Sequence, residues 1–121
     1  HADLAFLYGS ILTDGGDGSG GVATRNVCVF AEAEVDRSPT GSGVTARLAA
    51  MHARGEVGIG QPRLFESIVG SRFTGEVART VALADGRSGI VARVGGRAHY
   101  SGRAEYWVED GDALGRGFLV R

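Results

Sequence analysis

Residues 36–45 read Asp36-Arg37-Ser38-Pro39-Thr40-Gly41-Ser42-Gly43-Val44-Thr45 and lead from an extended apolar run into an alanine-rich segment. The strong helix propensity of residues 45–53 predicts a helix that begins inside this stretch. Either Ser38 caps the helix, with Pro39 in the first helical position, or Thr40 is the cap. Under both alternatives the backbone amides of residues 40–43 belong to the first turn, where they have no intrahelical acceptors.

The first turn of this helix is a candidate anion site, because free amides and the positive end of the helix dipole coincide there. Gly41 and Gly43 each cost roughly 1 kcal/mol of helix stability relative to alanine. A ligand that approaches the bare backbone would explain both glycines. The alternative is a Gly/Ser-rich turn that precedes an ordinary helix.

Asp36 places a negative charge just ahead of this candidate anion site. A ligand that also carries a positive group could pair with the carboxylate, and a zwitterionic amino acid meets both demands. Two alternatives stay open, in which the Asp36 side chain bonds to turn amides or forms an exposed pair with Arg37.

Residues 36–43 resemble the second active-site motif of the proline racemase family, in which Asp-Arg-Ser-Pro precedes a catalytic cysteine. Thr40 stands at the cysteine position, as in the branch of trans-3-hydroxy-L-proline dehydratases. Further segments fit that branch, namely residues 3–9, 11–15, 26–30, 73–75, 98–100 and 117–119. The resemblance therefore extends over nearly the whole chain.

The resemblance implies an α+β fold in which an antiparallel sheet or barrel wraps around one central helix. This is one half of the fold that proline racemases share with diaminopimelate epimerase. Residues 1–121 would form a single domain, the second half of a two-half enzyme. The first half's Met-Cys-Gly-His motif, with the other catalytic cysteine, has no match here, and Cys28 lacks a following Gly-His. We therefore expect the missing N-terminal half to be a partner and the fragment alone to be inactive.

Composition excludes several classes of protein. The chain has 121 residues, 13 basic and 14 acidic residues and a net charge of -1, with no basic stripe for nucleic acid. No apolar run is long enough to span a membrane, so no membrane association is expected. One cysteine cannot form an internal disulfide, and the expected location is the cytoplasm. Subunit number stays open, a homodimer being one option.

Before the helix, the sequence predicts two strands. Residues 4–12 are mostly apolar and indicate a buried strand, and residues 14–21 indicate a flexible hairpin tip. The two aspartates of this loop cannot supply the about six to eight oxygens that calcium takes, so we expect no metal site. Residues 25–35 indicate a second strand with Asn26, Cys28 and Phe30 on one face. Phe30 matches a position where the family places an aromatic ring against the substrate, and Cys28 is either core or pocket lining.

The predicted helix carries an apolar stripe of Val44, Leu48 and Met51. Arg47 and Arg54 are expected on its solvent side, Gly55 in a left-handed cap, and His52 at the boundary rather than as a ligand.

After the helix, four further strands are expected, over residues 63–69, 72–83, 89–94 and 97–108. Asp85-Gly86 and Gly95-Gly96 are hairpin turn signals. His99, in the last of these strands, is either an ordinary strand residue or a catalytic one. Residues 111–121 are expected to add a terminal strand to the other half of the enzyme.

The chemistry implied by the family depends on Thr40. A hydroxyl of this kind does not ionise near neutral pH, so one of the two bases of a racemase is lost and elimination replaces inversion. The expected reaction is dehydration of trans-3-hydroxy-L-proline to Δ1-pyrroline-2-carboxylate, without metal, nucleotide or pyridoxal phosphate.

In this scheme the amides of Gly41 and Ser42 hold the carboxylate, Asp36 binds the ring ammonium and Phe30 packs on the ring. Thr40 donates a hydrogen bond to the departing hydroxyl or to a water. Two alternatives remain: a hydroxyproline epimerase or proline racemase, or a non-catalytic amino-acid-binding or assembly module.

Overall fold

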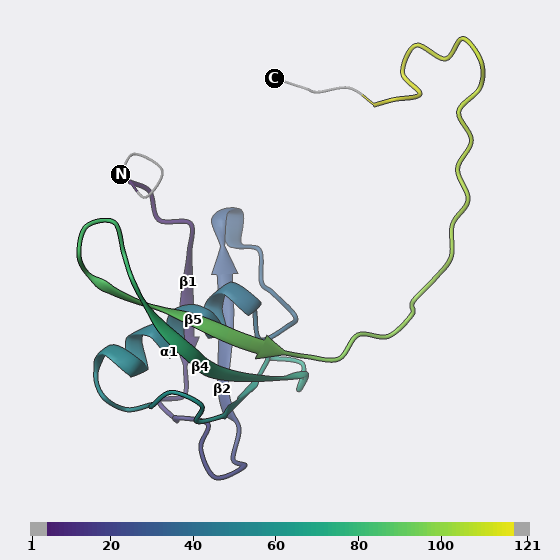
Figure 1. The fold of residues 1–121 in the computed structure, drawn as a ribbon. Coiled ribbons are helices and arrows are strands. Elements are labelled where there is room, and N and C mark those ends of the chain that lie inside the picture. The colour runs from purple at the N-terminus through teal and green to yellow at the C-terminus, as the bar shows by residue number, and fades with distance from the viewer. Residues whose placement is uncertain (1–4, 118–121) are drawn as a thin grey trace.

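The computed structural model describes residues 5–117. Within this range the chain forms five strands and one long helix, shown in Figure 1. The strands are β1 (Gly9–Thr13), β2 (Thr24–Phe30), β3 (Arg63–Glu66), β4 (Arg72–Ala82) and β5 (Ser88–Gly95). Helix α1 spans Gly41–Ala53, and a short 3-10 turn, η2, spans Ala31–Ala33. Within the described part, no helix is both long and apolar enough to cross a membrane.

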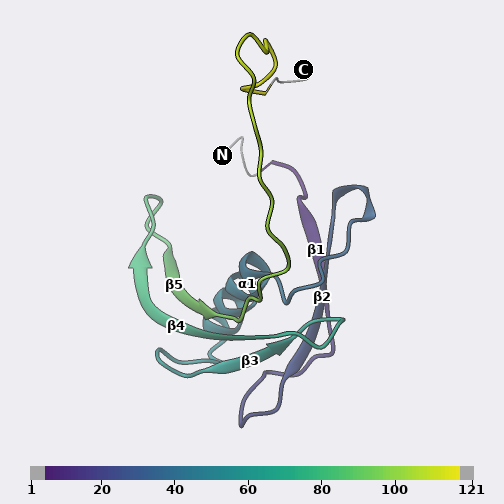
Figure 2. The ribbon, with the colours of Figure 1, turned by 90° about the vertical axis from the view of Figure 1, so that its right-hand side faces the viewer.

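The five strands form one sheet in the order β1-β2-β3-β4-β5. Figure 2 shows this sheet curving around α1, so the predicted architecture of a sheet wrapped on one helix is confirmed. The expectation of antiparallel pairing throughout is wrong at one place, because β2 and β3 are parallel. Since α1 lies between these two strands in sequence, it acts as a crossover that returns the chain in the same direction.

The core lies between α1 and the concave face of the sheet. Val44, Leu48 and Met51 are buried, as the predicted stripe requires, and pack with Val57, Phe65 and Val77. Gly75 of β4 lets the sheet approach closely, because a Cβ there would lie 2.8 Å from Val44 Cγ1 and 3.0 Å from Leu48 Cδ1.

The loop from residue 14 to residue 21 joins β1 and β2 as an antiparallel hairpin, as expected. It is anchored rather than loose. The Asp14 carboxylate accepts hydrogen bonds from the Arg25 amide (2.9 Å), the Thr24 hydroxyl (2.7 Å) and the Gly16 amide (2.9 Å). These donors, with the Arg25 amide first, lower the pKa of Asp14 to about 2. The described residues contain no group of three or more His, Cys, Asp or Glu side chains placed to hold a metal ion.

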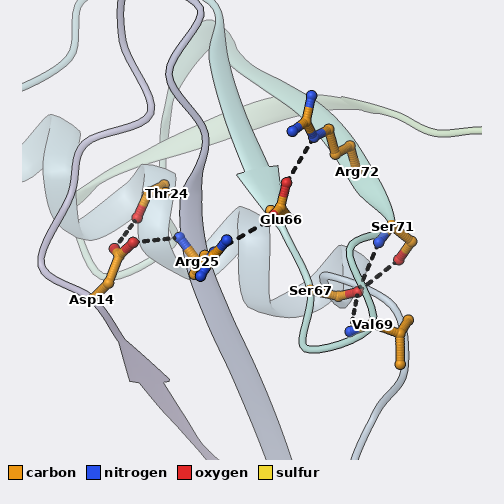
Figure 3. Close-up of polar contacts among 8 residues, drawn as sticks. All are labelled: Asp14, Thr24, Arg25, Glu66, Ser67, Val69, Ser71 and Arg72. Carbon is orange, nitrogen blue, oxygen red and sulfur yellow. Dashed lines mark hydrogen bonds and ion pairs between the residues drawn. The ribbon is translucent and has the colours of Figure 1, made fainter.

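Figure 3 shows how this hairpin is tied to the next strand. Arg25 of β2 donates to Glu66 of β3 at 3.1 Å, and Arg72 of β4 donates to the same carboxylate at 2.8 Å. Ser67 then closes the β3–β4 connection, because its hydroxyl oxygen accepts a hydrogen bond from the Ser71 amide at 3.2 Å. One carboxylate therefore joins three neighbouring strands at this edge of the parallel pair.

Two strands are shorter at their outer ends than predicted. β1 begins at Gly9, and Phe6, Leu7 and Tyr8 before it are exposed rather than buried. β2 ends at Phe30, since the chain then enters η2, where Glu32 and Ala33 have φ of 62° and 61°. Such left-handed backbone cannot continue a strand.

After β3 the expected pairing holds as far as β5 and then fails. Asp85-Gly86 forms the β4–β5 turn, with the Leu83 amide donating to the Arg87 carbonyl at 2.8 Å. Gly95-Gly96 is not a hairpin turn, and residues 96–117 form no strand, so the prediction for residues 97–108 is wrong. Figure 1 shows this segment leading away from the sheet, where no neighbouring strand can pair with it. His99 and Tyr100 are exposed there, and the end of the predicted terminal strand, 118–121, lies outside the described residues.

Candidate functional site at the start of helix α1

A cavity of about 250 Å³ opens beside the first turn of α1. β1 and the segment before it form one wall, β2 another, and the helix start the third. Its lining residues are Phe6, Leu7, Tyr8, Gly9, Ser10, Ile11, Cys28, Phe30, Thr40, Ser42, Gly43 and Ala46. Of the predicted site residues, the fold thus brings Phe30, Thr40 and Ser42 to one cavity, whereas Asp36 and Gly41 are not part of its lining.

The helix begins at Gly41, with Thr40 in the N-cap position. Ser38 and Pro39 precede the helix, so the alternative with Ser38 as cap and Pro39 in the first turn is wrong. The reason is local: the Ser38 hydroxyl accepts the Thr40 amide at 3.0 Å and closes a turn of its own before the helix starts. The Thr40 amide is consequently occupied, contrary to the expectation that it is free.

The next three amides are the site's donors. Val44 is the first helical residue whose amide reaches a backbone acceptor, the Thr40 carbonyl at 2.8 Å. Within the part of the chain that the structure describes, the amides of Gly41, Ser42 and Gly43 have no hydrogen-bond acceptor. Ser42 and Gly43 also line the cavity. Free donors, the positive helix end and a cavity therefore coincide, which suits a carboxylate.

Thr40 has an unusual backbone for a residue with a branched side chain, with φ of 65° and ψ of 110°. Its side chain is buried, and its hydroxyl donates to Asp36 Oδ2 at 2.7 Å instead of capping the helix. Toward the cavity the hydroxyl oxygen is therefore an acceptor in this arrangement. Donation to a departing group requires the bond to Asp36 to be exchanged.

Asp36 closes the turn that leads into Thr40. Its Oδ1 accepts the Ser38 amide at 2.8 Å, so the alternative in which the carboxylate bonds to a turn amide describes the structure. Hydrogen bonds lower the pKa of Asp36 below its ordinary value, the bond from the Thr40 hydroxyl having the larger effect and that from the Ser38 amide the smaller. The carboxylate is thus ionised at neutral pH and lies directly behind Thr40, with spare lone pairs on both oxygens.

Aromatic rings form the wall opposite the helix. The centroids of the Phe30 and Tyr8 rings are 5.4 Å apart. The Tyr8 ring in turn meets the Phe6 ring edge to face, with a centroid distance of 6.2 Å. Tyr8 was not expected at the site, although it belongs to one of the segments that resemble the family. Cys28 is 2% exposed and also lines the cavity, so its two alternatives, core and pocket lining, both apply.

Two polar residues behind the site were not foreseen. Asn26 is buried on β2, and its amide donates to the Pro39 carbonyl at 3.0 Å. Arg47 does not lie on the solvent side as predicted. It donates to Asn26 Oδ1 (3.2 Å), to Thr24 Oγ1 (2.9 Å) and to the Gly16 carbonyl (3.0 Å). Its burial lowers the pKa of the guanidinium. The sequence signal that could have placed Asn26 near the site is its alternation with Cys28 and Phe30, which puts the three residues on one face of the strand.

Sequence comparison identifies a matching protein family and named relatives of this chain. The proline racemase family matches residues 1–119. The chain is 52% identical over 120 residues to a trans-L-3-hydroxyproline dehydratase from Mus musculus and 49% identical to the trans-3-hydroxy-L-proline dehydratase of Homo sapiens. In both alignments 98% of this chain is covered but only 34% of the relative, so the chain spans about a third of their length.

Solved structures give the same result. A hydroxyproline epimerase from Agrobacterium vitis, with bound trans-4-hydroxy-L-proline, superposes with a TM-score of 0.72 at 33% sequence identity, covering 94% of this chain and 32% of that one. A probable proline racemase from Agrobacterium radiobacter K84, with bound carbonate, has the same TM-score at 27% identity and the same coverage. The fold is therefore one half of the fold of these proteins, and the chain belongs to the proline racemase family.

Proposed function

We propose that this chain is the second half of an enzyme that dehydrates trans-3-hydroxy-L-proline to Δ1-pyrroline-2-carboxylate. The observation that carries the proposal is the set of three amides without acceptors, Gly41 to Gly43, beside a cavity that also contains Thr40 and Phe30. The identity of about half of all positions to trans-3-hydroxyproline dehydratases supports this choice of substrate.

In the proposed complex, the amides of Gly41 and Ser42 receive the substrate carboxylate. Removal of the α-proton moves negative charge onto this carboxylate, so donors that already point at it stabilise the transition state more than the ground state. Loss of one such donor costs about 2.7–4 kcal/mol in enzymes that use them. No reorganisation is needed, because the helix holds these amides in place.

Asp36 would pair with the ring ammonium. Its carboxylate is ionised and already bonded to Thr40, which lies at the cavity, so the ammonium can approach the carboxylate from the side of that hydroxyl. Phe30 would pack against the pyrrolidine ring, with Tyr8 supporting its orientation through their ring contact. Binding a zwitterion between a helix start and a carboxylate satisfies both of its charges.

Thr40 determines the reaction type in this proposal. A base from the other half of the enzyme removes the α-proton, and the electron pair forms a double bond as the 3-hydroxyl leaves with a proton as water. The resulting enamine takes up a proton and becomes the cyclic imine. Because the Thr40 hydroxyl cannot act as a second base near neutral pH, no proton is returned to the opposite face of the α-carbon.

The partner in this proposal is the other half of the same enzyme. Two described segments expose large apolar side chains and pair with no strand: residues 6–8, with Leu7 82% exposed, and residues 106–108, with Trp107 80% exposed. Neither segment is part of a helix or strand, so each has backbone groups that could pair with a neighbouring sheet. This would bring the other half's base across the cavity from Thr40.

The experiment is product analysis with the full protein that carries this chain. With trans-3-hydroxy-L-proline in deuterated water, we expect the imine and no epimerised substrate. A Thr40→Cys variant introduces a thiol that ionises within reach of neutral pH, so we expect it to return deuterium to the α-carbon with the hydroxyl retained. If the unsubstituted protein itself epimerises the substrate, the dehydratase proposal is wrong.

A hydroxyproline epimerase is the second candidate, favoured by the superposition on the Agrobacterium vitis enzyme. It predicts deuterium at the α-position of recovered substrate. A non-catalytic binding module is the remaining outcome, and calorimetry separates it: tight binding of pyrrole-2-carboxylate by residues 1–121 alone, with no turnover by the full protein, would favour the module.

A further inference from the structure

Asn26 links helix α1 to the turn of residues 36–40 that precedes it. It is 4% exposed on β2, and both ends of its side-chain amide are hydrogen-bonded. Nδ2 donates to the Pro39 carbonyl at 3.0 Å, and Oδ1 accepts from Arg47 at 3.2 Å. A buried side chain that uses both polar atoms on two different elements holds these elements in a fixed relation.

Arg47 determines which way the Asn26 amide faces. A guanidinium only donates, so the side-chain oxygen of Asn26 must point at Arg47 and the NH₂ group must point at Pro39. Arg47 is itself immobilised by its bonds to Thr24 and to the Gly16 carbonyl, and its guanidinium lies 5.1 Å from the centre of the Phe65 ring. Arg47, which is held by these core contacts, therefore orients the Asn26 NH₂ group toward Pro39.

The bond to Pro39 acts on the peptide that leads into Thr40. The carbonyl of this peptide is held by Asn26, and its N–H is held by the Ser38 hydroxyl at 3.0 Å. Because a peptide unit is planar, holding its oxygen and its nitrogen fixes its rotation. That rotation sets the φ angle of Thr40, which is 65°.

Thr40 needs such restraint. A left-handed backbone at a branched residue is strained and persists only where the surroundings impose it. If the Pro39–Thr40 peptide rotated, Thr40 would relax, and the helix start that follows would turn with it. The direction of the amides of Gly41 to Gly43 therefore depends on a residue that does not line the cavity.

We propose that Asn26 is a positioning residue, which holds the Pro39–Thr40 peptide so that the free helix amides face the bound carboxylate and Thr40 stays in place at the cavity. Its effect on turnover rests on the proposed function. Its effect on the turn does not, so the two can be tested separately.

The test compares Asn26→Asp with Glu66→Gln in the full protein. Asn26→Asp keeps the shape and the acceptor for Arg47 but removes the donor to Pro39. Glu66→Gln is the matched control, because Glu66 is also a buried polar residue that bridges strands, through Arg25 and Arg72, but bonds to neither Asn26 nor Arg47 nor the turn. If Asn26→Asp does not fold, Asn26→Ser, which is too short to bridge Pro39 and Arg47, replaces it.

Two readouts are measured with threonine and glycine labelled by nitrogen-15. We expect Asn26→Asp to shift the amide resonances of Thr40, Gly41 and Gly43 and to speed the exchange of the Thr40 amide, and to lower kcat/KM by about 100-fold, as displaced catalytic groups do. Glu66→Gln should leave these resonances and kcat/KM near the values of the unsubstituted protein, even where its unfolding temperature falls.

Unchanged Thr40 and glycine resonances in Asn26→Asp overturn the positioning role, whatever the activity. Equal loss of activity in Glu66→Gln also overturns it, because it would trace the effect to general stability. If the unsubstituted protein turns over no imino acid, the proposed function fails, while the amide resonances still decide the role of Asn26.

Discussion

The two ends of helix α1 are built in opposite ways. At the C-terminal end, the Gly55 amide donates to the His52 carbonyl at 3.0 Å and the Glu56 amide to the Met51 carbonyl at 2.9 Å. This is the Schellman arrangement, with Gly55 at φ 76° as predicted. At the N-terminal end, a strained Thr40 stands where a capping side chain would normally bond, and three amides have no acceptor among the described residues.

The difference separates what stabilises the helix from what the helix is used for. A capping side chain contributes about 0.5–2 kcal/mol, and Thr40 has the hydroxyl to supply it but directs it to Asp36. The C-terminal end satisfies its carbonyls at no such cost. We infer that the N-terminal end is kept open for a ligand, and the following substitutions test this contrast from the largest expected effect to the smallest.

The largest effect is expected for Asp36→Asn at the N-terminal end. Asparagine can keep the turn but not the charge, so the binding of trans-3-hydroxy-L-proline should weaken by about 10–100-fold, the value of a charge-assisted hydrogen bond of about 1.5–3 kcal/mol. Pyrrole-2-carboxylate, which lacks the ammonium, should be affected much less. Calorimetry with both ligands on the full protein measures this, with Glu56→Gln at the other end as control. Equal weakening for both ligands would contradict the ammonium role.

The next effect concerns the two glycines of the first turn. A Cβ on Gly43 would lie 2.8 Å from Cys28 Sγ and 3.0 Å from Ile11 Cδ1, whereas one on Gly41 meets nothing within 4 Å. Overpacking costs about 1–3 kcal/mol, and the better helix propensity of alanine offsets at most about 1 kcal/mol. Denaturant unfolding should therefore show Gly43→Ala destabilised by about 1–2 kcal/mol and Gly41→Ala near neutral. A stable Gly43→Ala would show that the helix start can move away from β2.

An effect of about the same size is expected at the C-terminal end. Gly55→Ala places a Cβ on left-handed backbone, which costs about 1–2 kcal/mol, while the site at the other end keeps its geometry. We expect a lower unfolding midpoint with unchanged affinity for pyrrole-2-carboxylate. A loss of affinity larger than the loss of stability would show that the two ends are coupled.

The smallest effect is a difference in acid sensitivity. The pKa of Asp36 is lowered by the Thr40 hydroxyl and the Ser38 amide, and that of Glu56 by Arg54. A lowered folded-state pKa stabilises the fold above the ordinary value and loses this stabilisation as pH falls through the folded-state value. Both contributions should thus disappear in acid, below about pH 4. The exposed Arg54–Glu56 pair should also fade in high salt, whereas the partly buried Asp36 turn should not. Thermal unfolding of Asp36→Asn and Glu56→Gln across pH and salt checks this.

Local signals predicted the central elements because these elements depend on local contacts. The stripe of Val44, Leu48 and Met51, the Gly55 cap and the Asp85-Gly86 turn each follow from neighbouring residues, and all three are confirmed. Predictions failed where a partner strand decides the conformation. Residues 97–108 have strand-like composition, but a strand needs a neighbour, and none lies beside them in the described chain.

The site shows the same division. Residues 36–43 predicted an anion site because the first amides of a helix have no intrahelical acceptor. In the structure the amides of Gly41 to Gly43 are indeed without an acceptor among the described residues. The expectation for Arg47 was wrong. Its spacing of seven residues from Arg54, which is exposed, placed it on the solvent side, but the β1–β2 loop folds over it, and helix periodicity does not predict this long-range contact.

The sequence alone therefore determined the helix, its buried face, its C-terminal cap and the family to which the chain is similar, since these depend on residues close together in the chain. Only the tertiary structure decided that β2 runs parallel to β3, that Phe30 and Tyr8 face the helix start, and that Asn26 and Arg47 hold the turn before Thr40. These features join residues up to tens of positions apart, and their geometry exists only once the sheet has closed around the helix.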